Sequence, residues 1–134
     1  MVNLLIITHG EFGAYLVEAA EGIVGPQAGV RCVGISPRLT IDEVRGRVLS
    51  AVAELGPAEL VVVVDMPGGT PCNVVLPVVK DLAGAHVVSG LNLYMLVSAF
   101  NNRASLDGAR LAERMIECGR RAVADVKKML AAKR

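Results

Sequence analysis

Short, mostly apolar runs recur along the chain, and they are typical of strands that are buried on both faces. These runs are residues 2–7, 30–35, 60–64 and 86–89. The run at 60–64 is the most strand-like of them, because it contains consecutive valines and closes on Asp65. The pattern therefore predicts four strands.

Between these runs, apolar residues recur at the spacing of a helix with one buried face. The helices predicted in this way are residues 11–24, 41–55, 71–82, 92–100 and 105–132. The residues expected to be buried in the first helix are Phe12, Leu16, Ala19, Ala20 and Ile23. Those expected to be buried in the last, as one long helix, are Ala112, Ile116, Val123, Val126 and Leu130.

Residues with particular backbone roles mark the ends of two of these helices. Thr40 followed by Glu43 forms a capping box, in which each side chain accepts a hydrogen bond from the other residue's backbone N–H. Thr70 is expected to cap the third helix and Pro71 to open it, because proline at the first helical position loses no hydrogen bond. Pro77 is expected to kink or shorten that helix.

Strand and helix alternate along the chain, and this order favours a parallel sheet with right-handed crossovers. We therefore expect an α/β fold, an open and mainly parallel sheet with helices on both faces and strand order 2-1-3-4. The length of 134 residues suits one compact domain, so residues 1–134 are predicted to form a single domain. In such a fold, ligands bind outside the carboxyl ends of the strands.

Composition and charge disfavour several classes of protein. The hydrophobic share is 53% with only 3% aromatic residues, which indicates a core of aliphatic side chains. The formal net charge is +1 and the charged residues are scattered along the chain, so no basic stripe for nucleic acid is present. No apolar run is long enough to insert into a membrane. Cys32, Cys72 and Cys118 lack the spacing of a zinc site, so no metal is expected, and they suit a reducing cytoplasm. No P-loop motif for a nucleotide occurs, and no cofactor is expected.

Two side chains with complementary chemistry follow the first and third predicted strands. His9 follows the first strand and Asp65 follows the third. If these strands are neighbours, the imidazole and the carboxylate meet at one edge of the sheet. The carboxylate then fixes the ring tautomer, leaves the other ring nitrogen free to attack, and stabilises the cationic ring after phosphorylation. Taken singly, His9 is also typical of a polar strand terminator and Asp65 of a turn former.

A glycine-rich turn follows Asp65 and leads into the helix that Pro71 opens. Gly68, Gly69 and Thr70 supply free backbone N–H groups at the positive end of a helix dipole, where phosphoryl oxygens bind well. A tight loop with a helix cap is the alternative interpretation of the same three residues. The occurrence of both features at neighbouring strand ends favours a phosphohistidine site.

Two segments resemble the signature segments of the IIA domains of mannose-family sugar phosphotransferase systems. The first is residues 7–10, Ile-Thr-His-Gly, and the second is residues 65–73, with the pattern D-x-x-G-G-T-P-x-N. Residues 90–92 and 95–97 resemble the family's segment after the fourth strand. The resemblance extends along nearly the whole chain, and it departs at Pro67, where family members often have a bulky residue.

This resemblance implies that His9 is phosphorylated and that Asp65 is its hydrogen-bonding partner. It also implies a cytoplasmic phosphohistidine carrier, which receives the phosphoryl group from the phosphocarrier HPr and passes it to a IIB component for sugar uptake or regulation. Members of the family usually form homodimers, and the large apolar share of this small domain supports the same expectation. The sugar does not follow from the sequence, because such a carrier need not touch it.

Other protein classes share parts of this pattern. A response-regulator receiver would be phosphorylated on Asp65, but it needs an acidic pair after its first strand to hold magnesium, and this chain has Thr8 and His9 there. The phosphotransferase subunit of dihydroxyacetone kinase has a similar strand ending in histidine, but its aspartate loop typically lacks the Gly-Gly-Thr-Pro run of residues 68–71. A hydrolase with a His-Asp dyad is disfavoured, because no G-x-S-x-G motif accompanies the pair.

Overall fold

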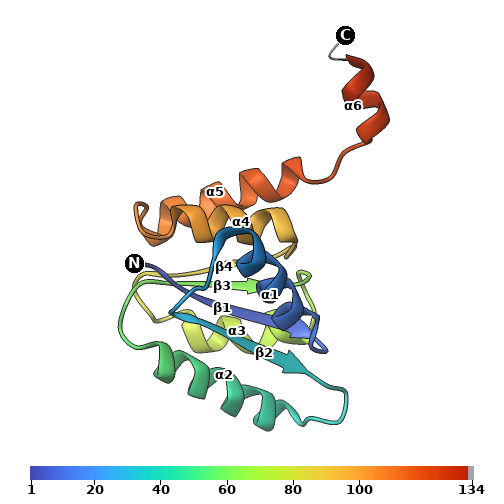
Figure 1. The fold of residues 1–134 in the computed structure, drawn as a ribbon. Helices are drawn as coiled ribbons and strands as arrows, with labels where there is room; N and C mark the ends of the chain where they lie inside the picture. The colour runs from blue at the N-terminus through green and yellow to red at the C-terminus, as the bar shows by residue number, and fades with distance from the viewer. Residues whose placement is uncertain (133–134) are drawn as a thin grey trace.

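The computed structural model describes residues 1–132, and its centre is a four-stranded parallel sheet in the order β2-β1-β3-β4 (Figure 1). The strands are β1 (Asn3–His9), β2 (Val30–Ile35), β3 (Leu60–Val64) and β4 (Ala85–Val88). β1 pairs with both β2 and β3, and β3 pairs with β4, always in parallel. The predicted fold class and strand order are confirmed.

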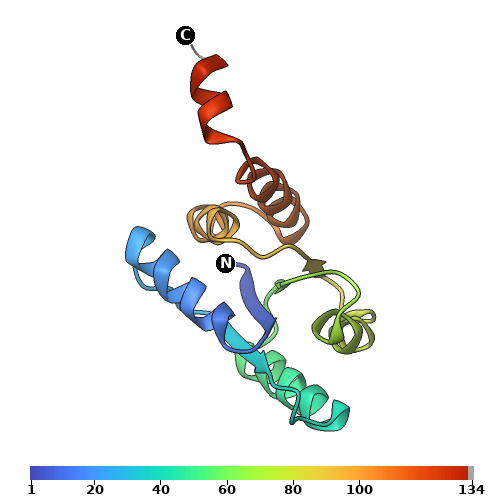
Figure 2. The same cartoon turned by 90° about the vertical axis from the view of Figure 1, so that its right-hand side faces the viewer.

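The described chain has six helices, of which the first three connect successive strands and the last three follow β4. They are α1 (Phe12–Val24), α2 (Ile41–Leu55), α3 (Thr70–Val79), α4 (Leu93–Asn102), α5 (Gly108–Arg121) and α6 (Val126–Ala132). α1, α4 and α5 pack on one face of the sheet, and α2 and α3 pack on the other (Figure 2). α6 projects away from the rest of the molecule in both views.

Alternate residues of the central strands contribute to two separate cores. In β1, Leu4 and Ile6 pack on the side of α1, α4 and α5, whereas Leu5 and Ile7 pack on the side of α2 and α3. All four side chains are fully buried. Because both faces of the strand are covered, the sequence shows an unbroken apolar run here rather than an alternation of apolar and polar residues. The sheet is the middle of three layers.

Several predicted boundaries shift by one or two residues. The first strand was predicted to end at Ile7, but β1 continues because its pairing with β2 extends until His9 lies opposite Ile35. β4 begins and ends one residue earlier than predicted, and α4 ends at Asn102 rather than at residue 100. The capping box of α2 is confirmed, since the side chains and backbone N–H groups of its two residues are hydrogen-bonded in both directions.

The prediction of one long helix over residues 105–132 is wrong. The helix stops after Arg121, and a non-helical stretch of residues 122–125 precedes α6. Asp125 accepts a hydrogen bond from the N–H of Lys128 at 3.0 Å, as a residue that caps the start of a new helix does. Consequently the predicted apolar stripe ends with α5, and Val123 and Leu130 are 86% and 57% exposed.

The predicted buried face of α1 is also wrong in part. Ala20 is buried and Leu16 packs against the core, as predicted, but Ala19 is exposed and Phe12 and Ile23 are 43% and 64% exposed. The other residues of the buried face are Gly13 and Val17. Gly13 sets this orientation, because a Cβ at this position would lie 2.9 Å from the side chain of Thr8. The helix therefore approaches the sheet through its small residues, and a pattern based on large apolar residues does not detect such a face.

α3 differs from the prediction at both ends. Its N-cap is Gly69 and not Thr70, and no side chain caps it. Pro71 lies in the first turn, as predicted. Pro77 lies inside the helix, where its ring nitrogen cannot donate a hydrogen bond, and the helix ends at Val79 instead of residue 82.

A buried arginine ties together the end of the sheet where the strands begin. The side chain of Arg103, at the end of α4, donates hydrogen bonds to the backbone oxygens of Val2, Ala28 and Gly29 and to the side-chain oxygen of Gln27, at 2.6 to 3.2 Å. Arg103 is only 1% exposed, and this burial lowers the pKa of its guanidinium. One cation therefore donates to several backbone oxygens at once, of which that of Gly29 also accepts from the N–H of Leu4 at 3.0 Å.

We predict that Arg103→Met lowers the free energy of unfolding by about 2 to 4 kcal/mol, because each buried carbonyl left without a donor costs about 1 to 3 kcal/mol. Urea denaturation measures the change. Arg110→Met is the matched control, since Arg110 lies exposed on α5, and it should change the stability by less than about 0.5 kcal/mol. Equal stability of the two variants would contradict the structural role of Arg103.

Candidate functional site

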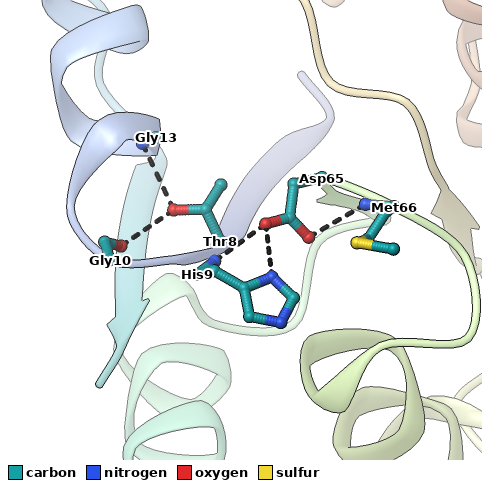
Figure 3. Close-up of polar contacts among 6 residues, drawn as sticks. All are labelled: Thr8, His9, Gly10, Gly13, Asp65 and Met66. Atoms are coloured by element: carbon teal, nitrogen blue, oxygen red, sulfur yellow. Dashed lines mark hydrogen bonds and ion pairs between the residues drawn. The ribbon is translucent and has the colours of Figure 1, made fainter. Parts of the chain in front are cut away.

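The pairing of β1 with β3 brings His9 and Asp65 together at the carboxyl end of the sheet. The backbone N–H of His9 donates to Oδ2 of Asp65 at 2.8 Å, and Nδ1 of the imidazole lies 2.8 Å from the same oxygen (Figure 3). The two residues are 56 positions apart in the sequence. The meeting of imidazole and carboxylate that the strand order predicted is therefore present.

Asp65 is held as a carboxylate by its surroundings. Burial raises the pKa of its carboxyl group, but hydrogen bonds from the backbone N–H and ring of His9 and from the backbone N–H of Met66 outweigh that effect, so the pKa lies below its ordinary value. The Met66 N–H donates to Oδ1 at 2.9 Å. The carboxylate is thus charged at neutral pH, and both of its oxygens are engaged.

The imidazole of His9 has one engaged nitrogen and one that faces the start of α3. A charged carboxylate can only accept a hydrogen bond, so the Nδ1–H group donates one to Asp65, and Nε2 of the neutral ring carries the lone pair. A Cβ built on Gly69 would lie 3.0 Å from Cε1 and 3.5 Å from Nε2 of the ring. The His9 side chain is 48% exposed, whereas that of Asp65 is 11% exposed. The free nitrogen is therefore open to a reaction partner.

The glycine-rich loop presents the N-terminus of α3 to this nitrogen. Gly68 has φ of +76°, a left-handed conformation that suits glycine, and Gly69 is the N-cap. The backbone N–H groups in the first turn of a helix have no intrahelical acceptor and can bind a ligand. Pro71 lies in this turn but has no N–H group to offer. The structure therefore places Gly69 beside the His9 ring, and Thr70 lines a pocket that the histidine also lines, whereas a Cβ on Gly68 would have no neighbour within 4 Å.

Thr8 fixes the turn that follows His9, a role for which the sequence analysis gave no indication. Its hydroxyl donates to the backbone oxygen of Gly10 at 3.0 Å and accepts from the N–H of Gly13 at 3.2 Å (Figure 3). Thr8 is 1% exposed. The available signal is a threonine placed between a strand and the first turn of a helix, where such side chains often bond to the backbone.

A mainly apolar pocket of about 560 Å³ opens beside the imidazole, between the end of β2 and the start of α2. The residues that line it include His9, Ser36, Pro37, Leu39, Ile41 and Thr70. Nothing in the sequence analysis assigned a role to this loop between β2 and α2. The pocket adjoins the imidazole, because His9 forms part of its wall.

The remaining histidine, cysteine and acidic side chains of the described residues do not form a second candidate site. Within residues 1–132, no cluster of three or more His, Cys, Asp or Glu side chains is placed to bind a metal ion, and none of the helices is long and apolar enough to cross a membrane. His86 lies in β4 next to Glu59 and Gly108, away from the His9 end of the sheet. Cys72 packs against the core under α2 and α3, as expected for a small packing residue.

Comparisons with known proteins agree with this arrangement. Residues 3–116 match the family described as "PTS system fructose IIA component", a stretch that includes both His9 and Asp65. The solved structure of the phosphotransferase system component EIIA from Streptococcus agalactiae superposes with a TM-score of 0.87 at 27% sequence identity, covering 96% of this chain and 99% of that one.

Two sequence relatives also carry an EIIA description. The sorbose-specific EIIA component of Lacticaseibacillus casei is 22% identical over 116 residues, which are 87% of this chain and 84% of that protein. The mannose-specific EIIAB component of Escherichia coli K12 is 28% identical over 130 residues, which are 94% of this chain but 40% of that protein. These comparisons give no support to the receiver or dihydroxyacetone kinase alternatives. The chain therefore belongs to the PTS system fructose IIA component family and is an EIIA component of the mannose and sorbose type.

Proposed function

We propose that this protein is a phosphohistidine carrier, which accepts a phosphoryl group from HPr on Nε2 of His9 and passes it to a IIB component for sugar uptake or regulation. The contact between Nδ1 of His9 and the carboxylate of Asp65 carries the proposal. Residues 1–134 act as one domain of this type. The dispersed free cysteines suit the cytoplasm, where both protein partners are expected.

The transfer step requires no group beyond those of the two proteins. The lone pair of Nε2 attacks the phosphorus of phospho-HPr, the P–N bond to the donor histidine breaks, and the donor nitrogen keeps the electron pair. The His9 ring then carries a positive charge, with its Nδ1 proton directed at Asp65. This charge-assisted hydrogen bond stabilises the phosphorylated ring by about 1.5 to 3 kcal/mol. In the second transfer, a nucleophile of the IIB component attacks the phosphorus, the P–N bond to Nε2 breaks, and Nε2 of His9 keeps the electron pair.

Gly68, Gly69 and Thr70 are proposed to bind the phosphoryl oxygens. The supporting observation is that the ring edge with Cε1 and Nε2 faces Gly69, the N-cap of α3. The free N–H groups and the positive end of the helix dipole favour an anion at this position. The absence of a side chain at Gly69 leaves the space that the ring and its phosphoryl group share.

Incubation with phosphoenolpyruvate, enzyme I and HPr should add one phosphoryl group to the protein, and intact-mass measurement detects it. His9→Ala should abolish the addition. Asp65→Asn should fold normally but accept the group more slowly by roughly one to two powers of ten, because it loses the charge of the carboxylate.

The chemistry of the label separates the possible acceptors. A phosphohistidine is labile in acid and stable in alkali, whereas an acyl phosphate on Asp65 would be labile in alkali. Full labelling of His9→Ala would refute the assignment of the acceptor. Equal rates for the wild type and Asp65→Asn would show that the carboxylate does not assist the ring.

Gly69→Ala tests the proposed phosphoryl-binding site at the start of α3. An added methyl group would lie 3.0 Å from Cε1 of His9, so the ring must move, and we expect the transfer rate to fall at least about 10-fold while the fold persists. Gly46→Ala on α2 is the control, because a methyl group there has no neighbour within 4 Å, and its transfer rate should equal that of the wild type. A wild-type transfer rate for Gly69→Ala would contradict the proposed phosphoryl-binding site.

We also propose that the protein forms a homodimer. Its apolar side chains on α6, Val126, Met129 and Leu130, are 59%, 44% and 57% exposed. β4 is an edge strand of the sheet, and a groove of about 680 Å³ runs beside it, with Leu76, Pro77 and other apolar residues in its walls. Surfaces of this kind are usually buried against a partner, and symmetric self-association is the commonest solution.

Light scattering should therefore give the mass of a dimer at micromolar concentration. Introducing Val126→Asp and Leu130→Asp together should shift the equilibrium toward the monomer, because charges disfavour burial of α6. Ile23→Asp on α1 is the control, since Ile23 is similarly exposed at 64%, and it should leave the mass unchanged. A monomeric wild type would contradict the proposal.

A further inference from the structure

The turn between β1 and α1 is held at the residue that directly follows His9. The backbone N–H of Gly10 donates to the backbone oxygen of Ile35 at 2.7 Å, and the backbone oxygen of Gly10 accepts from the hydroxyl of Thr8 at 3.0 Å. Gly10 has φ of +63°, a left-handed conformation that lets the chain turn sharply after the strand. Because His9 lies between Thr8 and Gly10, these bonds restrict its backbone.

Thr8 anchors this turn from inside the protein (Figure 3). The same hydroxyl that donates to Gly10 accepts from the N–H of Gly13 at 3.2 Å, so it joins the end of β1 to the first turn of α1. A Cβ on Gly13 would lie 2.9 Å from both the methyl carbon and the hydroxyl oxygen of Thr8, which shows how closely the helix approaches. Thr8 is 1% exposed, so it is too deeply buried to touch a protein partner.

Gly34 makes room for the same turn from the neighbouring strand. It lies directly opposite Thr8 in the pairing of β1 with β2. A Cβ on Gly34 would lie 2.7 Å from the backbone oxygen of Gly10 and would also meet the carboxylate of Glu11. A side chain at this position would therefore displace the oxygen atom to which Thr8 donates.

The position of the His9 backbone matters because two of its groups share one acceptor atom. The backbone N–H and Nδ1 of the ring both lie 2.8 Å from Oδ2 of Asp65. Burial raises the pKa of the Asp65 carboxyl group, and the backbone N–H of His9 is the strongest of the hydrogen bonds that lower it. If the turn moves, the two contacts cannot both be kept, and the ring loses the partner that fixes its tautomer.

From these contacts we infer that Thr8 is a positioning residue for phosphoryl transfer. Its hydroxyl, in the space that Gly34 leaves, holds the His9 backbone where the imidazole keeps the Nδ1–H tautomer and offers Nε2 to the phosphoryl group. The inference rests on the proposed function, because it takes Nε2 as the acceptor atom. Thr8 acts on the rate of transfer and not on the affinity for the donor, since a displacement of about 1 Å can slow a reaction by about two powers of ten.

Thr8→Val tests the inference, because it keeps the shape of the side chain and removes the hydroxyl. In single-turnover reactions with phospho-HPr, we expect the rate at saturating donor to fall about 10-fold, while the half-saturating donor concentration stays within about 2-fold of the wild type. In ¹⁵N NMR of the neutral ring, the Nδ1–H tautomer of His9 should give way to a mixture with the Nε2–H tautomer. Thr8→Ser, which restores the hydroxyl, should recover both the rate and the tautomer.

Gly34→Ala displaces the same turn from the opposite side, so it tests the inference even if Thr8→Val does not fold. It should lower the transfer rate and mix the tautomers in the same way. Arg103→Met is the control for lost stability, because it weakens the fold at the other end of the sheet, and it should keep the wild-type rate and tautomer.

A wild-type rate and tautomer in folded Thr8→Val or in Gly34→Ala would overturn the positioning role, and so would an equal loss of rate in Arg103→Met. A wild-type protein that phospho-HPr does not label would instead overturn the proposed function. The two failures are therefore distinguishable.

Discussion

The parallel pairing of β1 with β3 is the constraint on which the site depends. It sets Ile7 opposite Val64, so Asp65, one residue further on, and His9, two residues further on, lie at the same edge of the sheet. Both hydrogen bonds from His9 to Asp65 follow from this register, since one comes from the backbone and the other from the ring. A slip of one residue would move each side chain to the opposite face. The fully buried valines of β3, held between two cores, make such a slip very unfavourable.

Much of this arrangement could be predicted from the sequence because it depends on local signals. The valine run of β3, the capping box before α2 and the alternation of strand and helix each have a direct physical cause in nearby residues. Strand order followed from the common topology of such sheets, and it brought His9 next to Asp65. The same reasoning could have predicted that the free ring nitrogen of His9 faces Gly69, since the glycine-rich loop directly follows β3.

The features that could not be predicted depend on tertiary contacts. Val123 and Leu130 continue a helical pattern in the sequence, but the chain leaves the helical conformation before α6, and both side chains are exposed. The orientation of α1 depends on the contact of Gly13 with Thr8 across the turn. From the sequence, Arg103 cannot be distinguished from an ordinary surface arginine. The backbone oxygens that accept its hydrogen bonds are more than seventy positions away, and no sequence pattern indicates such distant contacts.

The clamp formed by Arg103 makes the two ends of the sheet differ in how they resist local opening. At the amino ends of the strands, one side chain joins the chain start, the α1–β2 connection and the end of α4, so these segments cannot separate independently. At the carboxyl ends, short-range bonds such as those of Thr8 and Asn73 hold the individual loops, and the hydrogen bonds of His9 to Asp65 link two of the segments. We therefore expect amide hydrogen exchange in the β1–α1 turn and the glycine loop to occur through smaller local openings than exchange at the opposite end, where three segments must separate together. The Arg103 end of the sheet is therefore the part that we expect to open last.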